Sequence, residues 1–436
     1  MPSWLQGLPN GSSRSGATSP GGASPPSGRS PSAGFAAERA AFGQAGSRRL
    51  DLTLLANAEA VYGPLLLEQR NVLLAGGKVV GLLDDAAAAA LRGAVQGLAV
   101  LDCSDCLVSP GFVDCHVHIT GGGGEAGPAS RCPASRLSEF LDAGVTTSMV
   151  VPDVCLQARA LNEEGMSAFT WIGSYHAPPA TVSGSIRRDL CLVDCALGVG
   201  ELAVADHRGS QLAPAELARI AAEARVGGML SGKAGLVHIH VGPGASGLQS
   251  LREAVACSDI PLSQFHPTHM DRSEALIDQG AQWLLDGGSL DFTGEWGQYH
   301  QAGVPLHNVT VSSDAFGSLP TYDSDGRLMK YTVADARALL RFLRNMYFQE
   351  HWPLERILPL MTSNPARLLK LPHKGRVAVG ADADVLVLSH DTLQLRYLYA
   401  KGVLRKTPQW TQGGFFEKGS KIKPYQAAED EEDKDF

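Results

Sequence analysis

Residues 111–127 read Gly111-Phe-Val-Asp-Cys-His-Val-His-Ile-Thr-Gly-Gly-Gly-Gly-Glu-Ala-Gly127. The run begins with an apolar pattern typical of a β-strand and reaches two histidines, His116 and His118. Because side chains alternate between the faces of a strand, a His-x-His pair projects both imidazoles to one side. The glycines that follow allow the backbone to approach whatever the imidazoles bind. If this strand ends in a barrel mouth and later strands supply further ligands, the two rings can bind a metal ion.

The chain on either side of this stretch has the pattern of an α/β barrel. Helical patterns, such as residues 215–225 and 273–285, separate short apolar runs. Eight alternating units over about 260 residues match a (β/α)8 TIM-like barrel, whose active site lies where the strands end. We therefore predict a barrel over residues 108–371, with strands at residues 108–117, 146–151, 168–174, 199–205, 235–241, 262–268, 289–293 and 309–313.

Shorter patterns flank the barrel segment. Residues 49–107 and 372–408 contain apolar runs split by Gly-Gly, Asp-Asp and Gly-Ala-Asp turns, which predict one small β domain built from both segments. Residues 1–48 are rich in Ser, Gly, Pro and Ala, a composition that predicts disorder. Residues 409–436 form a C-terminal tail with an acidic end.

Composition limits the partners and the compartment. The 436 residues, 44 % of them hydrophobic, can bury a large core, and the formal net charge is -8. No basic stripe or long apolar run occurs, so we predict neither a nucleic-acid nor a membrane partner. Eight cysteines without a disulfide-like spacing predict thiols in a reducing, cytoplasmic setting; Cys103-x-x-Cys106 lacks the second pair of a zinc finger. Residues 1–48 contain several arginines and a single acidic residue, Glu38. A mitochondrial transit peptide is therefore the alternative to a cytoplasmic protein with a disordered N-terminal segment.

Further candidate metal ligands recur at the predicted strand ends. Glu201 lies on the fourth strand, and the remaining candidates end the fifth, sixth and eighth strands: His240, His269 and Asp314. Four imidazoles and two carboxylates at one rim can hold two zinc ions, or one, and zinc lowers the pKa of its water to roughly 7. Asp314 would accept the proton of that water and pass it to the leaving group. The histidines left out are His176, His207, His238 and His266; His238 shares the face of His240 and could substitute for it.

Five strings resemble the isoaspartyl dipeptidases of the amidohydrolase superfamily. They are Pro110-Gly-Phe-Val-Asp-Cys-His-Val-His, Gly121-Gly-Gly-Gly-Glu-Ala-Gly-Pro, Arg159-Ala-Leu-Asn-Glu-Glu-Gly, Asp206-His-Arg and Ser312-Ser-Asp. The resemblance covers about Leu50 to Lys406. It implies a binuclear zinc barrel with a small β-sandwich, which cleaves β-aspartyl dipeptides by metal-bound hydroxide and usually forms a homo-oligomer.

The resemblance also implies residue roles. The metal ligands of the family fall on His116, His118, His240, His269 and Asp314, and its substrate residues fall on Glu125, Tyr175, Arg208, Arg272 and Ser318. A β-aspartyl dipeptide carries one ammonium group and two carboxylates. Glu125 can pair with the ammonium group, and the two arginines can bind the carboxylates. Tyr175 can donate a hydrogen bond to the developing oxyanion.

Two departures from the family pattern stand out. Glu201 aligns with the bridging, carbamylated lysine of the family, and it too offers two oxygens to two metals; a shift of one residue would place Gly200 there and leave no bridge. The loops after Val151 and Thr293 look shorter than in bacterial relatives, so the expected substrate threonine is not assigned, and Asp153 does not replace it. The alternatives are a cyclic-amide hydrolase of the dihydroorotase or hydantoinase kind, and a pseudoenzyme that acts as a binding protein.

Overall fold

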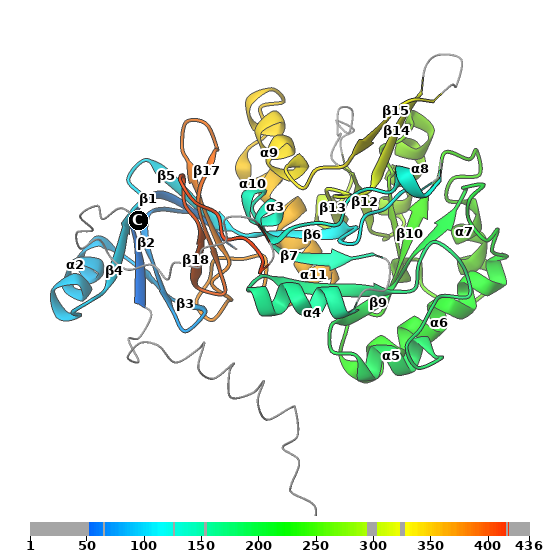
Figure 1. Ribbon diagram of the computed structural model, residues 1–436, viewed down its shortest axis with the longest axis horizontal. Coiled ribbons are helices and arrows are strands. Elements are labelled where there is room, and N and C mark those ends of the chain that lie inside the picture. The colour runs from blue at the N-terminus through cyan, green and yellow to red at the C-terminus, as the bar shows by residue number, and fades with distance from the viewer. Residues whose placement is uncertain are drawn as a thin grey trace, which may run out of the picture. The chain divides into compact units, whose positions relative to one another are not determined.

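The computed structural model describes residues 52–63, 66–124, 127–151, 155–293, 303–322, 328–415 and 417 (Figure 1). The predicted disordered segment and the acidic end of the tail lie outside the described residues. The same holds for Glu125, for Asp153 and for most of the loop after Thr293. The prediction of shortened loops therefore stays a prediction.

Eight parallel strands carry the centre of the fold, in the order in which they occur along the chain. Strands β6 to β11 form one sheet, β12 pairs with β13, and a parallel bridge joins Val117 to Ala315 beyond β13. The strands are β6 (Phe112–Val117), β7 (Val145–Val150), β8 (Ser167–Ile172), β9 (Ala196–Val204), β10 (Leu236–Val241), β11 (Phe265–Thr268), β12 (Leu290–Phe292) and β13 (Val309–Val311). Each of the eight predicted segments overlaps one of these strands, although the sixth begins with the 3₁₀ turn Leu262–Gln264, and the parallel sheet curls as a TIM-like barrel requires.

Helices follow most of these strands, and buried apolar residues hold them against the sheet. The Ser273 hydroxyl accepts a hydrogen bond from the Leu276 amide at 3.3 Å and starts α8, which buries Trp283. The helices are α3 (Leu137–Asp142), α4 (Cys155–Glu164), α5 (Ile186–Leu192), α6 (Pro214–Ser231), α7 (Gln249–Ala256), α8 (Glu274–Leu285), α9 (Ala338–Phe348), α10 (Leu354–Ile357) and α11 (Ser363–Leu368). A hairpin of β14 (Ser318–Tyr322) and β15 (Leu328–Val333) separates β13 from α9. None of the described helices is both long and apolar enough to cross a membrane.

The predicted first strand, residues 108–117, is in fact two strands in two sheets. It divides at Gly111 into β5 (Cys106–Pro110) and β6. A Cβ atom on Gly111 would lie 2.2 Å from Thr146 Oγ1, so only glycine fits where the chain passes β7. The uninterrupted apolar pattern concealed this break, because both strands are buried along their whole length.

A second, mixed sheet combines strands from both flanking segments. Its order is β18-β17-β16-β5-β1-β2-β3, with β4 paired to β1. The strands are β1 (Leu52–Tyr62), β2 (Leu66–Ala75), β3 (Lys78–Leu83), β4 (Ala99–Asp102), β16 (Val385–Ser389), β17 (Leu395–Ala400) and β18 (Val403–Lys406). Helix α2 (Asp85–Ala94) packs against it through Ala88, which contacts Leu54 and Ala56. The two segments therefore share one sheet, while a sandwich of two sheets stays a prediction.

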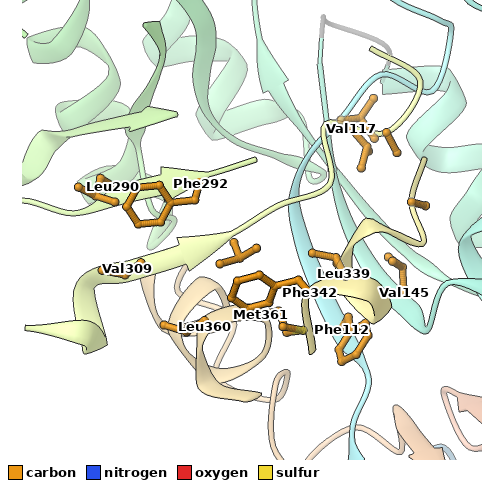
Figure 2. Packing of buried hydrophobic residues seen from close by; sticks show 14 of the residues in the cluster. Phe112, Val117, Val145, Leu290, Phe292, Val309, Leu339, Phe342, Leu360 and Met361 are labelled. Carbon is orange, nitrogen blue, oxygen red and sulfur yellow. The ribbon is translucent and has the colours of Figure 1, made fainter. Parts of the chain in front are cut away.

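The main core lies between the parallel strands and the last helices. Figure 2 shows apolar side chains of α9 and of the 3₁₀ turn Leu358–Met361 packed toward the strands. The residues labelled there are Phe112, Val117, Val145, Leu290, Phe292, Val309, Leu339, Phe342, Leu360 and Met361. This packing fixes β6 and β13, the two strands that lead into the candidate ligands His116, His118 and Asp314.

Candidate active site

The six predicted metal ligands converge at the carboxyl ends of the parallel strands. His116 Nε2 lies 3.2 Å from His118 Nε2, and His118 Nε2 lies 3.0 Å from Asp314 Oδ1. Within the described residues, two groups of these ligands have atoms within 4.8 Å of one another: His116, His118 and Asp314, and His116, Glu201 and His269. A third group of this kind, Cys115, His266 and Asp291, contains none of the predicted ligands. Residues from five strands, far apart in sequence, therefore form one cluster.

Glu201 occupies the middle of this cluster. Its Oε2 atom lies 3.1 Å from His240 Nδ1, 3.4 Å from His116 Nε2 and 3.9 Å from His269 Nε2. Its Oε1 atom lies 3.6 Å from His118 Nε2. Both carboxylate oxygens thus face imidazoles, Oε1 facing His118 and Oε2 facing the other three histidines.

The backbone is held in an unusual conformation where two of these ligands leave their strands. His269 has a φ angle of 63° and Asp314 a φ angle of 51°, and Ala205, after β9, has 52°. Residues other than glycine seldom adopt positive φ, and such strain is concentrated at functional sites. The strand ends are thus shaped to present side chains, at a cost to local backbone stability.

The charges of the cluster support one another. Burial would raise the pKa of Glu201, but His116 and His240 outweigh it and hold the pKa well below its usual value. Burial would lower the pKa of His116, but the Glu201 and Asp314 carboxylates raise it to about 9. Burial likewise opposes ionisation of Asp314, yet His116 and His118 keep its pKa low. Two buried anions therefore persist beside the imidazoles.

The donor set fits one or two divalent metal ions. Asp314 Oδ1 has His118 Nε2 as its neighbour at 3.0 Å, whereas His116 Nδ1 is buried and has no hydrogen-bond partner within the described residues. Buried polar atoms are seldom left without partners, so a group that these residues bind is expected here. Imidazole nitrogens with carboxylate oxygens are the ligand types that zinc takes, at about 2.0–2.2 Å.

Three of the predicted substrate residues lie beside the cluster. The Tyr175 hydroxyl contacts His240 Nε2 and accepts a hydrogen bond from Arg208 at 3.1 Å. One Arg272 guanidinium nitrogen lies 3.0 Å from His240 Nε2 and donates to the Val241 carbonyl at 2.9 Å. Ser318 starts β14, pairs with Val333, and forms no hydrogen bond or ion pair with these side chains in the described part of the chain. Glu125 lies outside the described residues.

Asp206 is a further residue of the site that the sequence pattern does not assign, although it begins the string Asp206-His-Arg. Its side chain is completely buried and binds the Arg208 guanidinium through both oxygens, at 3.1 and 2.8 Å. Its Oδ2 atom also lies 3.1 Å from the Tyr175 hydroxyl and 3.3 Å from His240 Nε2. A carboxylate directly after the fourth strand was the available signal.

None of the four histidines outside the predicted site belongs to the two groups of predicted ligands, although the His238 ring packs edge-on against the His116 ring at 4.9 Å between centroids. His238 is buried, stacks on Trp171 with ring centroids 4.9 Å apart, and places Nδ1 3.2 Å from the His266 carbonyl. His266 lies deeper, where its nitrogens contact the hydroxyls of Ser289 at 3.0 Å and Thr310 at 3.2 Å. The other two, His176 and His207, are exposed. His240, and not His238, faces Glu201.

We expect His266 to make the metal-free protein sensitive to acid. Burial lowers its pKa to about 4, whereas an unfolded histidine titrates near pH 6.5. Its contribution to stability is therefore complete above pH 6.5 and falls, by roughly 3 kcal/mol in total, as the pH drops to 4. Urea unfolding from pH 7 to 4 with a chelator should show a flatter pH dependence for His266→Asn than for the wild type. His207→Asn, at an exposed site, should retain the wild-type slope; equal slopes in all three proteins would refute the expectation.

Known proteins are similar to this chain in both sequence and fold. The model described as the amidohydrolase family matches residues 298–415. A crystal structure of a β-aspartyl dipeptidase from Fervidobacterium islandicum AW-1, in complex with the β-Asp-Leu dipeptide, is 34 % identical and has a TM-score of 0.76. It covers 84 % of this chain and 100 % of its own, and a second structure of the enzyme from this organism is 33 % identical, with a TM-score of 0.73. A dihydroorotase of Listeria welshimeri is 24 % identical over 417 residues, which cover 78 % of this chain and 90 % of that protein.

Proposed function

Because this chain belongs to the β-aspartyl dipeptidase family of the amidohydrolase superfamily, we propose that it hydrolyses isoaspartyl dipeptides with the help of zinc. The observation that carries this proposal is the position of Glu201 among four histidines, next to a tyrosine and two arginines. Metal ligands, a hydrogen-bond donor and carboxylate-binding groups thus lie within one cluster. This combination supports hydrolysis of a small, charged amide.

The metal-binding part of the proposal concerns six side chains. His116, His118 and Asp314 would hold one ion and His240 and His269 the other, with Glu201 shared between them. When bound, the ions supply Lewis-acid polarisation of the scissile carbonyl and a lowered pKa for the attacking water. Glu201 would replace the carbamylated lysine that is usual in this family.

The proton transfers are assigned to Asp314 and the oxyanion to Tyr175. The low pKa of Asp314 keeps its carboxylate ionised at neutral pH, so it can accept the proton of the water and return it to the leaving amine. Burial and the nearby Glu201 charge raise the pKa of Tyr175, so its hydroxyl stays protonated and can donate to the oxyanion. Each group is therefore in the protonation state that its role needs.

The charged groups of the site support a dipeptide substrate. Arg208 and Arg272 lie on the same side of His240 and can bind the two carboxylates of a β-aspartyl dipeptide. We assign the ammonium group to Glu125 and a substrate hydrogen bond to Ser318. The likeness to the dihydroorotase favours a cyclic amide as the second candidate.

Two further proposals concern the compartment and the oligomeric state: we propose that the protein is cytoplasmic and that it forms a homo-oligomer. All eight cysteines lie in the described residues, and no disulfide joins any of them, which favours a reducing compartment. The homo-oligomer is the usual state that the family resemblance implies.

A comparison of substrates tests the proposal directly. The purified full chain is loaded with zinc, its metal content is measured, and it is assayed with β-Asp-Leu, α-Asp-Leu and dihydroorotate. We expect hydrolysis of β-Asp-Leu alone, and loss of that activity on removal of the metal. Turnover of dihydroorotate without β-Asp-Leu would establish the second candidate. Failure to bind metal together with no turnover of any substrate would identify an impaired, non-catalytic barrel.

A further inference from the structure

Asp206, which has no role in the proposed reaction, lies at the centre of a hydrogen-bond network with Tyr175, Arg208 and His240. Besides the Arg208 guanidinium, its carboxylate accepts the Arg208 backbone amide at 2.8 Å, so residues 206–208 form a closed turn. Because the side chain is completely buried, these contacts replace the water that an ionised carboxylate would otherwise need. The turn stands directly against the ring of His240, whose Nε2 atom is 3.3 Å from Asp206 Oδ2.

The two nitrogens of His240 face opposite partners. Nδ1 points to Glu201 and the metal-binding cluster, and Nε2 points to Asp206, Tyr175 and Arg272. A neutral imidazole carries one proton, and the nitrogen without it can bind a metal. If Nδ1 held the proton, it would donate to Glu201 Oε2 at 3.1 Å and would be closed to a metal.

The neighbours of Nε2 are consistent with a proton on that nitrogen. Arg272 has an acceptor in the Val241 carbonyl, so its hydrogen need not go to the ring. The Tyr175 hydroxyl can donate to Asp206 at 3.1 Å while its oxygen accepts from Arg208. A proton on Nε2 can then be donated to the Asp206 carboxylate or to the Tyr175 oxygen. Without that proton, the Nε2 lone pair would face the negative charge of Asp206, which is repulsive.

We propose that Asp206 is a positioning residue that keeps the proton of His240 on Nε2 and so leaves Nδ1 open to a divalent metal. The same carboxylate holds the Arg208 guanidinium beside the site. Metal binding and recognition of a substrate carboxylate are thereby connected through one buried side chain. This inference rests on the proposed function, because it assumes that His240 is a metal ligand and that Arg208 binds substrate.

Two substitutions separate the two roles. Asp206→Asn should weaken zinc affinity by roughly 10- to 100-fold, the usual effect of losing an outer carboxylate on a ligand histidine, and should also raise KM for β-Asp-Leu. Arg208→Gln should raise KM and leave zinc affinity unchanged. Zinc affinity is measured by competition with a chromophoric chelator in the absence of substrate, so the measurement does not depend on turnover.

Asp335→Asn is the matched control. Asp335 accepts the Arg337 amide at 3.0 Å and the Arg337 guanidinium at 3.2 Å, the same aspartate-x-arginine arrangement, but it is partly exposed and contacts no predicted metal ligand within the described residues. Its substitution should change neither zinc affinity nor KM. In Asp206→Asn the Arg208 guanidinium loses its carboxylate partner, so the double variant Asp206→Asn/Arg208→Gln removes the guanidinium as well. Urea unfolding establishes that each variant is folded.

The outcomes are distinct. Weak zinc binding in both Asp206 variants, with normal binding in Arg208→Gln, supports the inference. Wild-type zinc affinity in a folded Asp206→Asn protein overturns it, even if KM rises. Failure of the wild-type protein itself to bind zinc or to cleave β-Asp-Leu overturns the proposed function instead, and the wild-type measurements reveal this before any variant is compared.

Discussion

Replacing Glu201 by glutamine is expected to abolish hydrolysis of β-Asp-Leu and to lower the zinc content from about two ions per chain to one or none. The amide retains one oxygen but loses the charge that binds two cations. Its nitrogen would also direct hydrogens at His116 or His240, which now face Glu201 Oε2 at 3.4 and 3.1 Å. Because loss of an outer-shell partner already costs roughly 10- to 100-fold in metal affinity, loss of the shared ligand should cost more.

Zinc analysis and the β-Asp-Leu assay on the same preparation check this expectation. Glu223→Gln is the matched control, because Glu223 forms an exposed ion pair with Arg187 at 2.5 Å and such pairs contribute little. It should behave as the wild type. A Glu201→Gln protein that keeps two zinc ions and full turnover would show that Glu201 is not the bridge.

Asp314→Asn should lower kcat for β-Asp-Leu by roughly 10²- to 10⁴-fold, the contribution of a general base. Asparagine preserves the size of the side chain but cannot accept the proton of the water. The second proposed ion would be held by His240, His269 and Glu201 without Asp314, so at least one zinc ion should remain bound. The expected signature is thus a protein that still contains metal but is nearly inactive.

Single-turnover kinetics with measured zinc content provide the test. Asp286→Asn removes an exposed carboxylate that pairs with Arg252 at 2.8 Å and should leave kcat unchanged. Wild-type kcat in Asp314→Asn would exclude Asp314 as the base. Complete loss of zinc would show that Asp314 acts chiefly as a ligand.

The strands and the ligand cluster could be predicted because both depend on local pattern. Buried parallel strands read as short apolar runs, and a polar residue at the end of such a run must point to the rim of the barrel. This logic identified His240, His269 and Asp314 without any knowledge of distance. It also favoured His240 over His238, and His238 instead packs on Trp171 in the interior.

Asp206 and the break at Gly111 could not be predicted in the same way. Asp206 matters because Tyr175 and His240, on different loops and strands, meet at its carboxylate, and local sequence does not encode such a meeting. Gly111 divides a continuous apolar run only because Thr146 of the neighbouring strand occupies the space that a side chain would need. Both features arise from tertiary contacts.

The division at Gly111 also has a consequence for how the chain can fold during synthesis. Strand β5, just before the division, pairs along its length with β16, which lies more than half the chain later in sequence. Contacts between such distant segments form slowly, because a long loop must close before they are gained. Until the ribosome has delivered residues 385–389, β5 therefore has only its short parallel pairing with β1, at Ala60 and Val61. A nascent chain that stops earlier would expose the edge of β5, and chaperones would have to protect it.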